Sequence, residues 1–262
     1  MTSQGEKIVL VGAGNMATQL ALALSNKGCE ILQVYSRTID SARLLADRIG
    51  ECTMYTNSIA EIVTDADLYI FSLSDSALPD VINQMQPNGA LWIHTAGSMP
   101  MDVFADKCAR YGVLYPMQTV NKDRVVDWSD VPIFVEASNE DDTQYLVQLS
   151  QRLSNNVSRS NSQQRQSLHL AAVFACNFSN HMYAIAERLL NEQGLDFDVM
   201  KYLIRETEHK AESISPVDGQ TGPAVRNDVN VMDKHLALLG DSPEGELYRL
   251  ISKNIMQYKP KQ

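Results

Sequence analysis

The sequence predicts an α/β protein in which a parallel sheet wrapped by helices is followed by an all-helical domain. The first half of the chain alternates short apolar runs with helical patterns, as chains that form parallel sheets do. The alternation stops at a stretch rich in serine and asparagine, residues 154–162, after which only the helical period remains. We therefore expect two domains, residues 1–157 and residues 158–262.

The composition is that of a globular protein and excludes several other classes. Of 262 residues, 44% are hydrophobic and 21% are charged, which is ordinary for a chain with a buried core. Lys and Arg number 22 against 32 Asp and Glu, a formal charge of -10 with no basic run, so we expect no nucleic acid and no membrane partner. The sequence has no signal-peptide pattern and no apolar stretch of membrane-spanning length, which predicts a cytoplasmic protein.

The first half contains a regular succession of elements. Lys7–Val11 is a continuous apolar strand, and Met16, Leu20 and Leu24 recur on one helix face after it. Gly28 is placed to end that helix. The same patterns predict strands at residues 30–35, 68–73, 90–94, 113–115 and 133–135, helices at 42–49, 98–111 and 141–153, and an edge strand near residue 157.

The second half has only helical patterns. The expected helices span residues 163–191, 197–213, 229–239 and 243–258. The first of them has a broad apolar face that includes Leu168, Phe174 and Phe178. Such a face exposes enough apolar surface to predict a homodimer.

The strongest local motif is Gly12-Ala13-Gly14-Asn15-Met16-Ala17, a Gly-x-Gly-x-x-Ala run between a strand and a helix. Gly12 permits a tight turn, Gly14 lets the backbone approach a pyrophosphate, and Ala17 lets the helix pack closely on the strand. The N–H groups at the start of the helix, near Asn15 and Met16, are available to an anion. The motif predicts a Rossmann-type dinucleotide site, and the alternative is a turn with a purely structural role.

The residues after the second strand indicate which dinucleotide is bound. An NAD site requires a carboxylate there for the ribose hydroxyls, whereas this chain has Ser36, Arg37 and Thr38. The two hydroxyls can donate hydrogen bonds and Arg37 can pair with a 2′-phosphate, which favours NADP(H) as the cofactor. The alternative is that Arg37 is simply solvated on a loop.

Small and hydroxyl-bearing residues follow the later strands, whose carboxyl ends should meet at the same crevice. From these loops we expect Leu73, Ser74, Thr95, Ala96 and Gly97 to bind the cofactor, with Gly97 letting a ribose lie close to the backbone. A third loop, residues 115–118, should line the same crevice. As ordinary strand-to-helix caps, these residues would look much the same.

The helical half contributes candidate catalytic and substrate-binding residues. His169 and Asn177 lie on one face of a helix, where they can protonate and orient a carbonyl or imine group. Thr221 and Arg226 lie in a turn between helices, and Arg226 can clamp a substrate carboxylate. The alternatives are hydrogen-bonded packing for His169 and helix capping for Arg226.

The four cysteines, at 29, 52, 108 and 176, form no Cys-x-x-Cys pair and no cluster with histidine, so we expect buried thiols and no metal site. The chain has no Gly-x-Ser-x-Gly elbow, no His-Glu-x-x-His motif and no P-loop. Their absence excludes the common hydrolase, zinc protease and NTPase classes.

Two sets of motifs resemble known families. Residues 12–17 followed by Tyr35–Thr38 resemble the start of pyrroline-5-carboxylate reductases and related NADP-dependent enzymes. Residues 94–98, 115–119, 169–178 and the turn 221–228 resemble a group that joins a Rossmann-like half to a helical half classed as domain of unknown function 2520. The resemblance covers nearly the whole chain. It implies an NADP oxidoreductase whose cofactor crevice is closed by the helical domain, often with a partner subunit helping.

The sequence departs from one pattern of this superfamily. The 6-phosphogluconate and hydroxyacid dehydrogenases use a lysine four residues before an asparagine on the first long helix, and this chain has Val173 and Asn177 at that spacing. His169 lies one turn earlier, so we nominate it as the acid/base and Asn177 as the residue that orients the substrate.

These observations predict an NADP(H)-dependent oxidoreductase that transfers hydride to or from a small carbonyl, imine or hydroxyacid at the domain cleft. The rival interpretation is a non-catalytic dinucleotide-binding sensor or partner-binding protein, which the missing lysine favours. A methyltransferase conflicts with Ser36 and Arg37 and with the all-helical second half. The sequence does not identify the substrate.

Overall fold

The computed structural model describes residues 5–258, and the contacts within it divide the chain into two compact units. The first unit ends at Asn177 and the second begins at Phe178.

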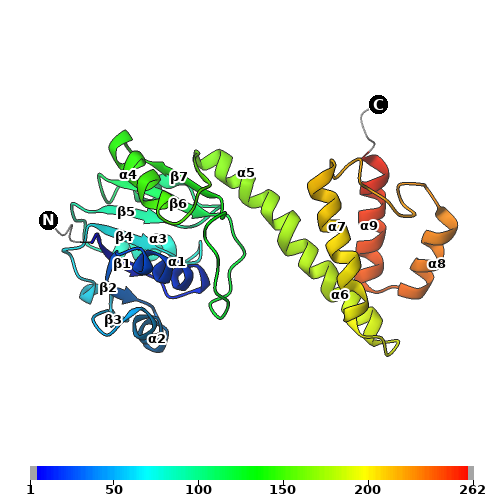
Figure 1. Cartoon of the computed structure of the whole chain (residues 1–262), viewed down its shortest axis with the longest axis horizontal. Helices are drawn as coiled ribbons and strands as arrows, with labels where there is room; N and C mark the ends of the chain where they lie inside the picture. Colours follow the sequence, from blue (N-terminus) through cyan, green and yellow to red (C-terminus); the bar gives the residue numbers. More distant parts are fainter. Residues whose placement is uncertain (1–4, 259–262) are drawn as a thin grey trace. The chain divides into compact units, whose positions relative to one another are not determined.

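The first unit is built on one eight-stranded sheet in the order β3-β2-β1-β4-β5-β6-β7-β8 (Figure 1). All neighbouring strands are parallel except β6 and β7, which are antiparallel. The strands are β1 Lys7–Val11, β2 Glu30–Tyr35, β3 Met54–Thr56, β4 Leu68–Phe71, β5 Leu91–His94, β6 Tyr111–Pro116, β7 Ile133–Ala137 and β8 Val157–Arg159. The strand order reverses between β1 and β4, and in open α/β sheets ligands bind beside such a reversal, at the carboxyl ends of the strands.

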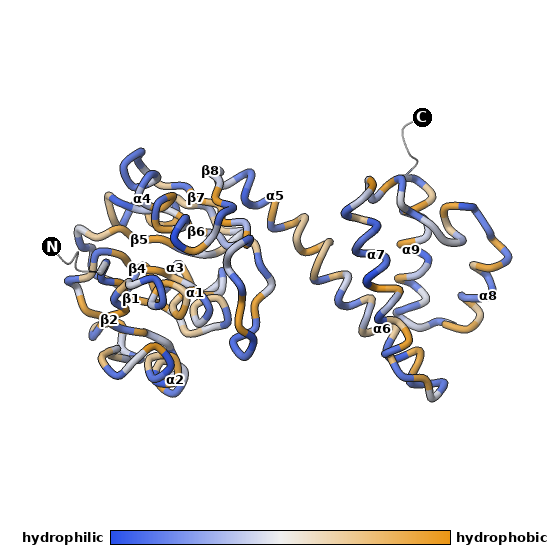
Figure 2. The backbone as a smooth tube through the Cα atoms, in the orientation of Figure 1, coloured by the Kyte–Doolittle hydropathy of each residue, from blue (hydrophilic) through white to orange (hydrophobic). Residues whose placement is uncertain are grey.

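Helices cover the sheet, and residues that alternate along each strand form two cores. On one face Ile8 and Leu10 pack in a cluster with residues of α1 (Asn15–Asn26), α2 (Ile39–Ile49) and α4 (Glu140–Gln151). On the other face Val9 and Val11 pack in a cluster with Trp92, Phe104 and residues of α3 (Leu78–Gln84). Because both faces are covered, the central strands are almost continuously apolar, as Figure 2 shows.

A long helical segment begins in the first unit, where α5 (Ser162–Ala172) is followed by a π-helical stretch, Val173–Phe178. Asn161 starts α5 with a capping box in which its side chain accepts from the Gln164 N–H at 2.9 Å. The sequence pattern puts the domain boundary after residue 157, where the strand–helix alternation ends. The contacts instead keep residues 158–177 with the first unit, because α5 is fastened there by the buried side chain of Arg165.

The second unit contains only helices among its described residues, as the sequence predicts. They are α6 Ser179–Asn191, a 3₁₀ turn at Phe197–Met200, α7 Lys201–Ser213, α8 Val229–Leu239 and α9 Pro243–Gln257. Arg188 of α6 pairs with Glu244 of α9 at 2.8 Å, and His235 of α8 contacts the Tyr248 hydroxyl of α9 at 2.9 Å. Of its described residues only Ala224, Met232, Gly245 and Ser252 are buried.

One expected helix of the first unit was wrong, and one strand was missed. The expected helix at residues 98–111 is only a short 3₁₀ helix, Met101–Phe104, and strand β6 already begins at Tyr111, so Gly112 lies inside a strand. A Cβ at Gly112 would stand 2.4 Å from the Glu136 carbonyl oxygen of β7, so this glycine allows two antiparallel strands to approach closely. Strand β3 was not predicted, because its three residues include the exposed Met54 and Tyr55 and have no apolar pattern.

Among residues 5–258, no helix combines the length and the apolar character that crossing a membrane requires.

Candidate functional site

A cleft of about 720 Å³ lies at the carboxyl ends of β1, β4, β5 and β6 in the first unit. Four loops and one helix line it, through residues 14–16, 72–75, 95–98, 115–119 and 168–177. Ten of the residues nominated from the sequence lie in this lining: Gly14, Asn15, Met16, Leu73, Ser74, Thr95, Ala96, Gly97, His169 and Asn177. The fold therefore brings together loops that are far apart in the sequence.

The two glycines of the turn after β1 have different roles: Gly12 is required by the backbone, and Gly14 leaves space beside the helix. Gly12 has φ +125°, and a Cβ there would lie 2.2 Å from the Ser72 carbonyl oxygen, so this position requires glycine. Its N–H donates to the Tyr35 carbonyl at 2.8 Å. At Gly14, by contrast, no atom of residues 5–258 outside the adjoining backbone lies within 4 Å of the Cβ position. The turn thus leaves free space directly beside the N-terminus of α1, where backbone N–H groups attract an anion.

Gly14 is the cap residue of α1 and supplies no side chain to its first N–H groups. The first turn of α1 also carries no acidic residue. Ala17 is fully buried beneath this turn, as close packing of the helix on the strand requires. The residues therefore fit a bound pyrophosphate, with space at Gly14 and uncompensated positive charge at the helix end.

The loop after β5 is held by two buried side chains at the peptide groups of Ala96. His94 is fully buried, and its Nδ1 accepts the Ala96 N–H at 3.1 Å while its Nε2 lies 3.3 Å from the Pro100 carbonyl. Arg165 donates from Nε to the Ala96 carbonyl at 3.2 Å and from its terminal nitrogen to the Met99 carbonyl. Burial lowers the pKa of His94 to about 4, and the nearby charge of Arg165 acts in the same direction. His94 is thus a neutral imidazole that braces the cleft loop.

Arg165 is itself paired inside the protein. Its guanidinium is fully buried against the carboxylate of Glu136 on β7, which also accepts the Ser162 hydroxyl at 2.8 Å. The pattern of the sequence did not point to this pair, since its members are 29 residues apart and neither belongs to a motif. The pair holds the start of α5 to the sheet and thereby sets the position of His169, one turn further along the helix.

His169 occupies the space that Gly97 leaves open. A Cβ at Gly97 would lie 2.7 Å from Cγ and Nδ1 of His169, so any larger residue would displace the imidazole. The sequence predicts a cofactor ribose beside Gly97, whereas in the structure this space holds the His169 ring. The Tyr115 hydroxyl lies 3.3 Å from Nδ1 of His169, and the two rings meet edge to face.

The π-helical stretch contributes Ala175, Cys176 and Asn177 to the cleft lining. A π turn adds one residue to a helical turn and is frequent at functional sites. His169 and Asn177 both line the cleft, as do Cys176 and Ala172, whereas Val173 does not. Val173 lies four residues from both His169 and Asn177, and its N–H donates to the His169 carbonyl as in a regular α-helix, but it is not part of the lining.

A loop between β6 and β7 lies against the start of α1. The buried Gln19 side chain donates to the carbonyls of Asn121 and Arg124 at 2.8 and 2.7 Å, and the Lys122 N–H donates to the Asn15 side chain at 3.3 Å. These contacts hold the loop that contributes Met117, Gln118 and Thr119 to the cleft.

The remaining nominated residues lie outside the cleft lining. Ser36, Arg37 and Thr38 follow β2, next to the β1 end, and Thr38 is the cap residue of α2. Arg37 is exposed and makes no hydrogen bond or ion pair within residues 5–258. Thr221 is exposed in the second unit, as is Arg226 in the turn before α8.

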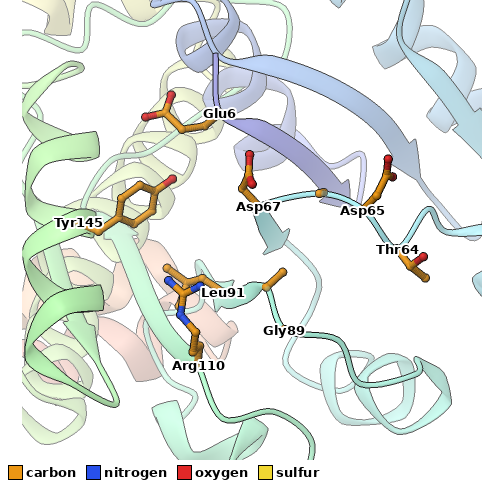
Figure 3. Close-up of a pocket in the computed structure, with 10 residues that line it drawn as sticks. Glu6, Thr64, Asp65, Asp67, Gly89, Leu91, Arg110 and Tyr145 are labelled. Carbon is orange, nitrogen blue, oxygen red and sulfur yellow. The ribbon is translucent and has the colours of Figure 1, made fainter. Parts of the chain in front are cut away.

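A second hollow, of about 530 Å³, lies at the opposite, amino-terminal edge of the sheet (Figure 3). Its charged side chains are engaged in the fold: Arg110 pairs with Asp142 at 2.5 Å, and Glu6 pairs with Arg152 at 2.7 Å. Asp67 accepts the Lys7 N–H at 2.9 Å. These contacts fix the strand starts, so we assign this edge a structural role.

The described part of the chain has no group of three or more His, Cys, Asp or Glu side chains placed to hold a metal ion. The four cysteines are unpaired. Cys29 and Cys108 are buried as expected, but Cys52 and Cys176 are exposed, which corrects the expectation for these two. Cys176 is exposed because it lies in the cleft lining.

Comparison with known proteins agrees with the fold. A family model for a domain of unknown function, DUF2520, matches residues 131–255, and a model for shikimate/quinate 5-dehydrogenases matches residues 1–89. The chain is thus a Rossmann-type α/β protein with a helical C-terminal region.

A crystal structure from Bacteroides fragilis, provisionally described as an NADP oxidoreductase, is 48% identical, with 97% of this chain and 99% of that chain covered and a TM-score of 0.90. The chain belongs to the family of that protein, in which a Rossmann-type half precedes a DUF2520 region.

More distant structures share the fold. An imine reductase from Myxococcus stipitatus in complex with NADP⁺ is 14% identical, with 96% of this chain and 92% of that chain covered and a TM-score of 0.64. A 1-pyrroline-5-carboxylate reductase from Streptococcus pyogenes is 12% identical, with 97% and 100% covered and a TM-score of 0.64. Among curated proteins, glutamyl-tRNA reductase from Rhodopirellula baltica is 38% identical over 71 residues, 27% of this chain, and this match spans only 17% of that enzyme.

Proposed function

We propose that the protein is an NADP(H)-dependent oxidoreductase whose cofactor lies in the cleft of the first unit. The observation that carries this proposal is the open position at Gly14, beside an uncapped helix N-terminus at the reversal of strand order. The NADP⁺ complex of the imine reductase and the description of the Bacteroides fragilis protein support the same cofactor class.

Each part of the chain has a proposed task. The start of α1, with Asn15 and Met16, binds the pyrophosphate, and the loops at Leu73–Ser74 and Thr95–Gly97 bind the nicotinamide half. Ser36, Arg37 and Thr38 bind the 2′-phosphate, because they offer two hydroxyls and an unpaired guanidinium where an NAD site has a carboxylate.

The bound cofactor supplies or accepts a hydride, which the protein side chains do not do. His169 donates or accepts the accompanying proton, and Asn177 orients the reacting oxygen or nitrogen of a small carbonyl, imine or hydroxyacid. Thr221 and Arg226 bind the polar end of that substrate.

Binding of the two nicotinamide cofactors tests the proposal. We expect NADPH to bind more tightly than NADH, and Arg37→Ala to weaken NADPH binding about tenfold while leaving NADH binding unchanged. The measurement is a fluorescence titration of nicotinamide, with Arg205→Ala, an exposed arginine of α7, as the matched control. Failure of both cofactors to bind would refute the oxidoreductase assignment and favour the sensor or partner-binding alternative.

A second experiment separates an enzyme from a dinucleotide-binding sensor. Once a substrate has been found among keto acids, imines and hydroxyacids, His169→Ala should lower turnover at least 100-fold, the usual contribution of an acid/base group. Its NADPH affinity should equal that of the wild type. Loss of NADPH binding in this variant would instead remove His169 from the acid/base role.

The proposed enzyme is a homodimer that associates through the second unit. Large apolar side chains are exposed on several of its helices, including Tyr202 at 71%, Leu203 at 60%, Leu238 at 86% and Leu250 at 67%. Leu203→Glu should therefore give a monomer in light scattering, whereas Val125→Glu, at the 92% exposed residue of the first unit, should remain a dimer. A monomeric wild-type protein at micromolar concentration would contradict the dimer.

A further inference from the structure

Tyr115 has no role in the function proposed so far, yet its hydroxyl contacts the proposed acid/base. It lies near the end of β6 with 7% of its surface exposed, and its Oη is 3.3 Å from Nδ1 of His169. The two ring centroids are 6.2 Å apart, at an angle of 78°. The phenol therefore meets the edge of the imidazole that carries Nδ1.

The other side of the His169 ring is also fixed. Gly97 lies so close that the ring cannot move toward the loop after β5, since a Cβ there would stand 2.7 Å from Cγ and Nδ1. Nε2 makes no hydrogen bond within residues 5–258, and His169 lines the cleft. Nδ1 thus faces the protein and Nε2 is left for a ligand.

An imidazole that exchanges its proton at Nε2 keeps a proton on Nδ1 in both states, because loss of the Nε2 proton from the imidazolium leaves the Nδ1–H form. That form is stabilised by an acceptor at Nδ1. In the described part of the chain, the acceptor within hydrogen-bond distance of Nδ1 is Oη of Tyr115. A phenol oxygen accepts a hydrogen bond in either state of the imidazole.

Burial keeps the Tyr115 phenol in its neutral form. Desolvation raises the pKa of Tyr115 above its ordinary value of 10, although the positive charge of Arg165 opposes this. The phenol therefore keeps its proton at neutral pH and meets His169 as a neutral hydroxyl.

We propose that Tyr115 is a positioning residue whose hydroxyl oxygen accepts the Nδ1–H of His169 and so presents Nε2 to the substrate. In the reducing direction the Nε2–H bond of the imidazolium breaks, and its proton goes to the substrate oxygen or nitrogen while the adjacent carbon receives the hydride. The imidazole left behind is the neutral Nδ1–H tautomer, and oxidation runs through the same steps in reverse. This inference rests on the proposed function, in which His169 is the acid/base.

The tautomer can be measured without any substrate. Imidazole nitrogen-15 NMR spectra at alkaline pH, with His169 assigned through His169→Gln, should show the Nδ1–H form in the wild-type protein. Tyr115→Phe keeps the packed ring and removes only the acceptor, so His169 should shift toward the Nε2–H form. Tyr145→Phe, at the opposite edge of the sheet, should leave the His169 signals unchanged. A wild-type His169 in the Nε2–H form, or no change in Tyr115→Phe, would overturn the proposal.

Kinetics on the same variants distinguishes this inference from the proposed function. Tyr115→Phe should lower kcat about three- to tenfold, the effect of one hydrogen bond, with KM and NADPH affinity unchanged. An unchanged kcat would also overturn the positioning role. If no NADPH binds to the wild-type protein, the proposed function fails, but the tautomer spectra still decide what Tyr115 does to His169.

Discussion

The two units of this chain differ in how much of their apolar surface they bury. The first unit has apolar cores on both faces of its sheet, with Trp92, Phe104 and Leu24 almost wholly buried. The second unit, among its described residues, buries only Ala224, Met232, Gly245 and Ser252. A helical unit that leaves Leu238 at 86% exposure has not completed its own core.

This difference in buried apolar surface suits the two units to different proposed tasks. A unit with a complete core can hold a cleft rigidly, and the proposed cofactor residues lie in the first unit. A unit without one needs another surface to cover it, which is the physical reason to propose a second copy.

The largest effect is expected when the two units are produced as separate fragments and their unfolding is compared. A fragment of residues 1–177 should unfold cooperatively, with a free energy of unfolding of about 5–15 kcal/mol, because it keeps both cores. A fragment of residues 178–262 should show no cooperative transition as a monomer and should gain structure only as its concentration rises. Urea unfolding followed by circular dichroism measures both, and a monomeric second fragment that unfolds cooperatively would break the comparison.

The next largest effect is the loss of unfolding free energy in the first unit when the buried ion pair between Arg165 and Glu136 is broken. Arg165→Met leaves the buried Glu136 carboxylate without its charged partner and with only the Ser162 hydroxyl, which costs about 3–5 kcal/mol of unfolding free energy. The same change also frees the Ala96 and Met99 carbonyls, so NADPH affinity should fall. Arg159→Met is the matched control, because Arg159 pairs with Glu140 at the surface and its loss should matter much less. Equal losses in the two variants would show that the pair does not hold the cleft.

His94 makes the stability of the first unit depend on pH. Its pKa falls from 6.5 to about 4 on folding, so between these values the unfolded chain binds a proton that the folded protein does not. The free energy of unfolding therefore has its full value above pH 6.5 with respect to His94. It falls by about 3 kcal/mol in total as the pH is lowered toward 4. His94→Gln should flatten this part of the stability curve, which urea unfolding at pH 7, 5.5 and 4.5 measures. Parallel curves for the two proteins would contradict the neutral, buried imidazole.

Local features of the fold and site could be predicted from the sequence. The glycine turn and the hydroxyl-bearing loops are contiguous motifs, and the rule that strand ends meet at one edge is enough to bring them together. Gly28, which ends α1 with φ +84°, is another local signal.

The rest of the site depends on contacts between residues that are far apart in sequence. Tyr115 and His169 are 54 residues apart, and Glu136 and Arg165 are 29 apart, so no periodic pattern links them. The helix prediction at residues 98–111 failed for the same reason, because the glycine at position 112 is required by the neighbouring strand and does not mark a helix end. The π turn at 173–178 also has no sequence pattern of its own.

The most direct test of the central claim, that the first-unit cleft binds a nicotinamide dinucleotide at the start of α1, is an NADPH titration of Gly14→Ala. Because no atom of the described residues outside the adjoining backbone lies within 4 Å of the Cβ position, the melting temperature should equal that of the wild type. The added methyl group occupies the space proposed for the pyrophosphate, so NADPH affinity should fall at least about tenfold. Unchanged affinity in a variant that is equally stable would contradict the account.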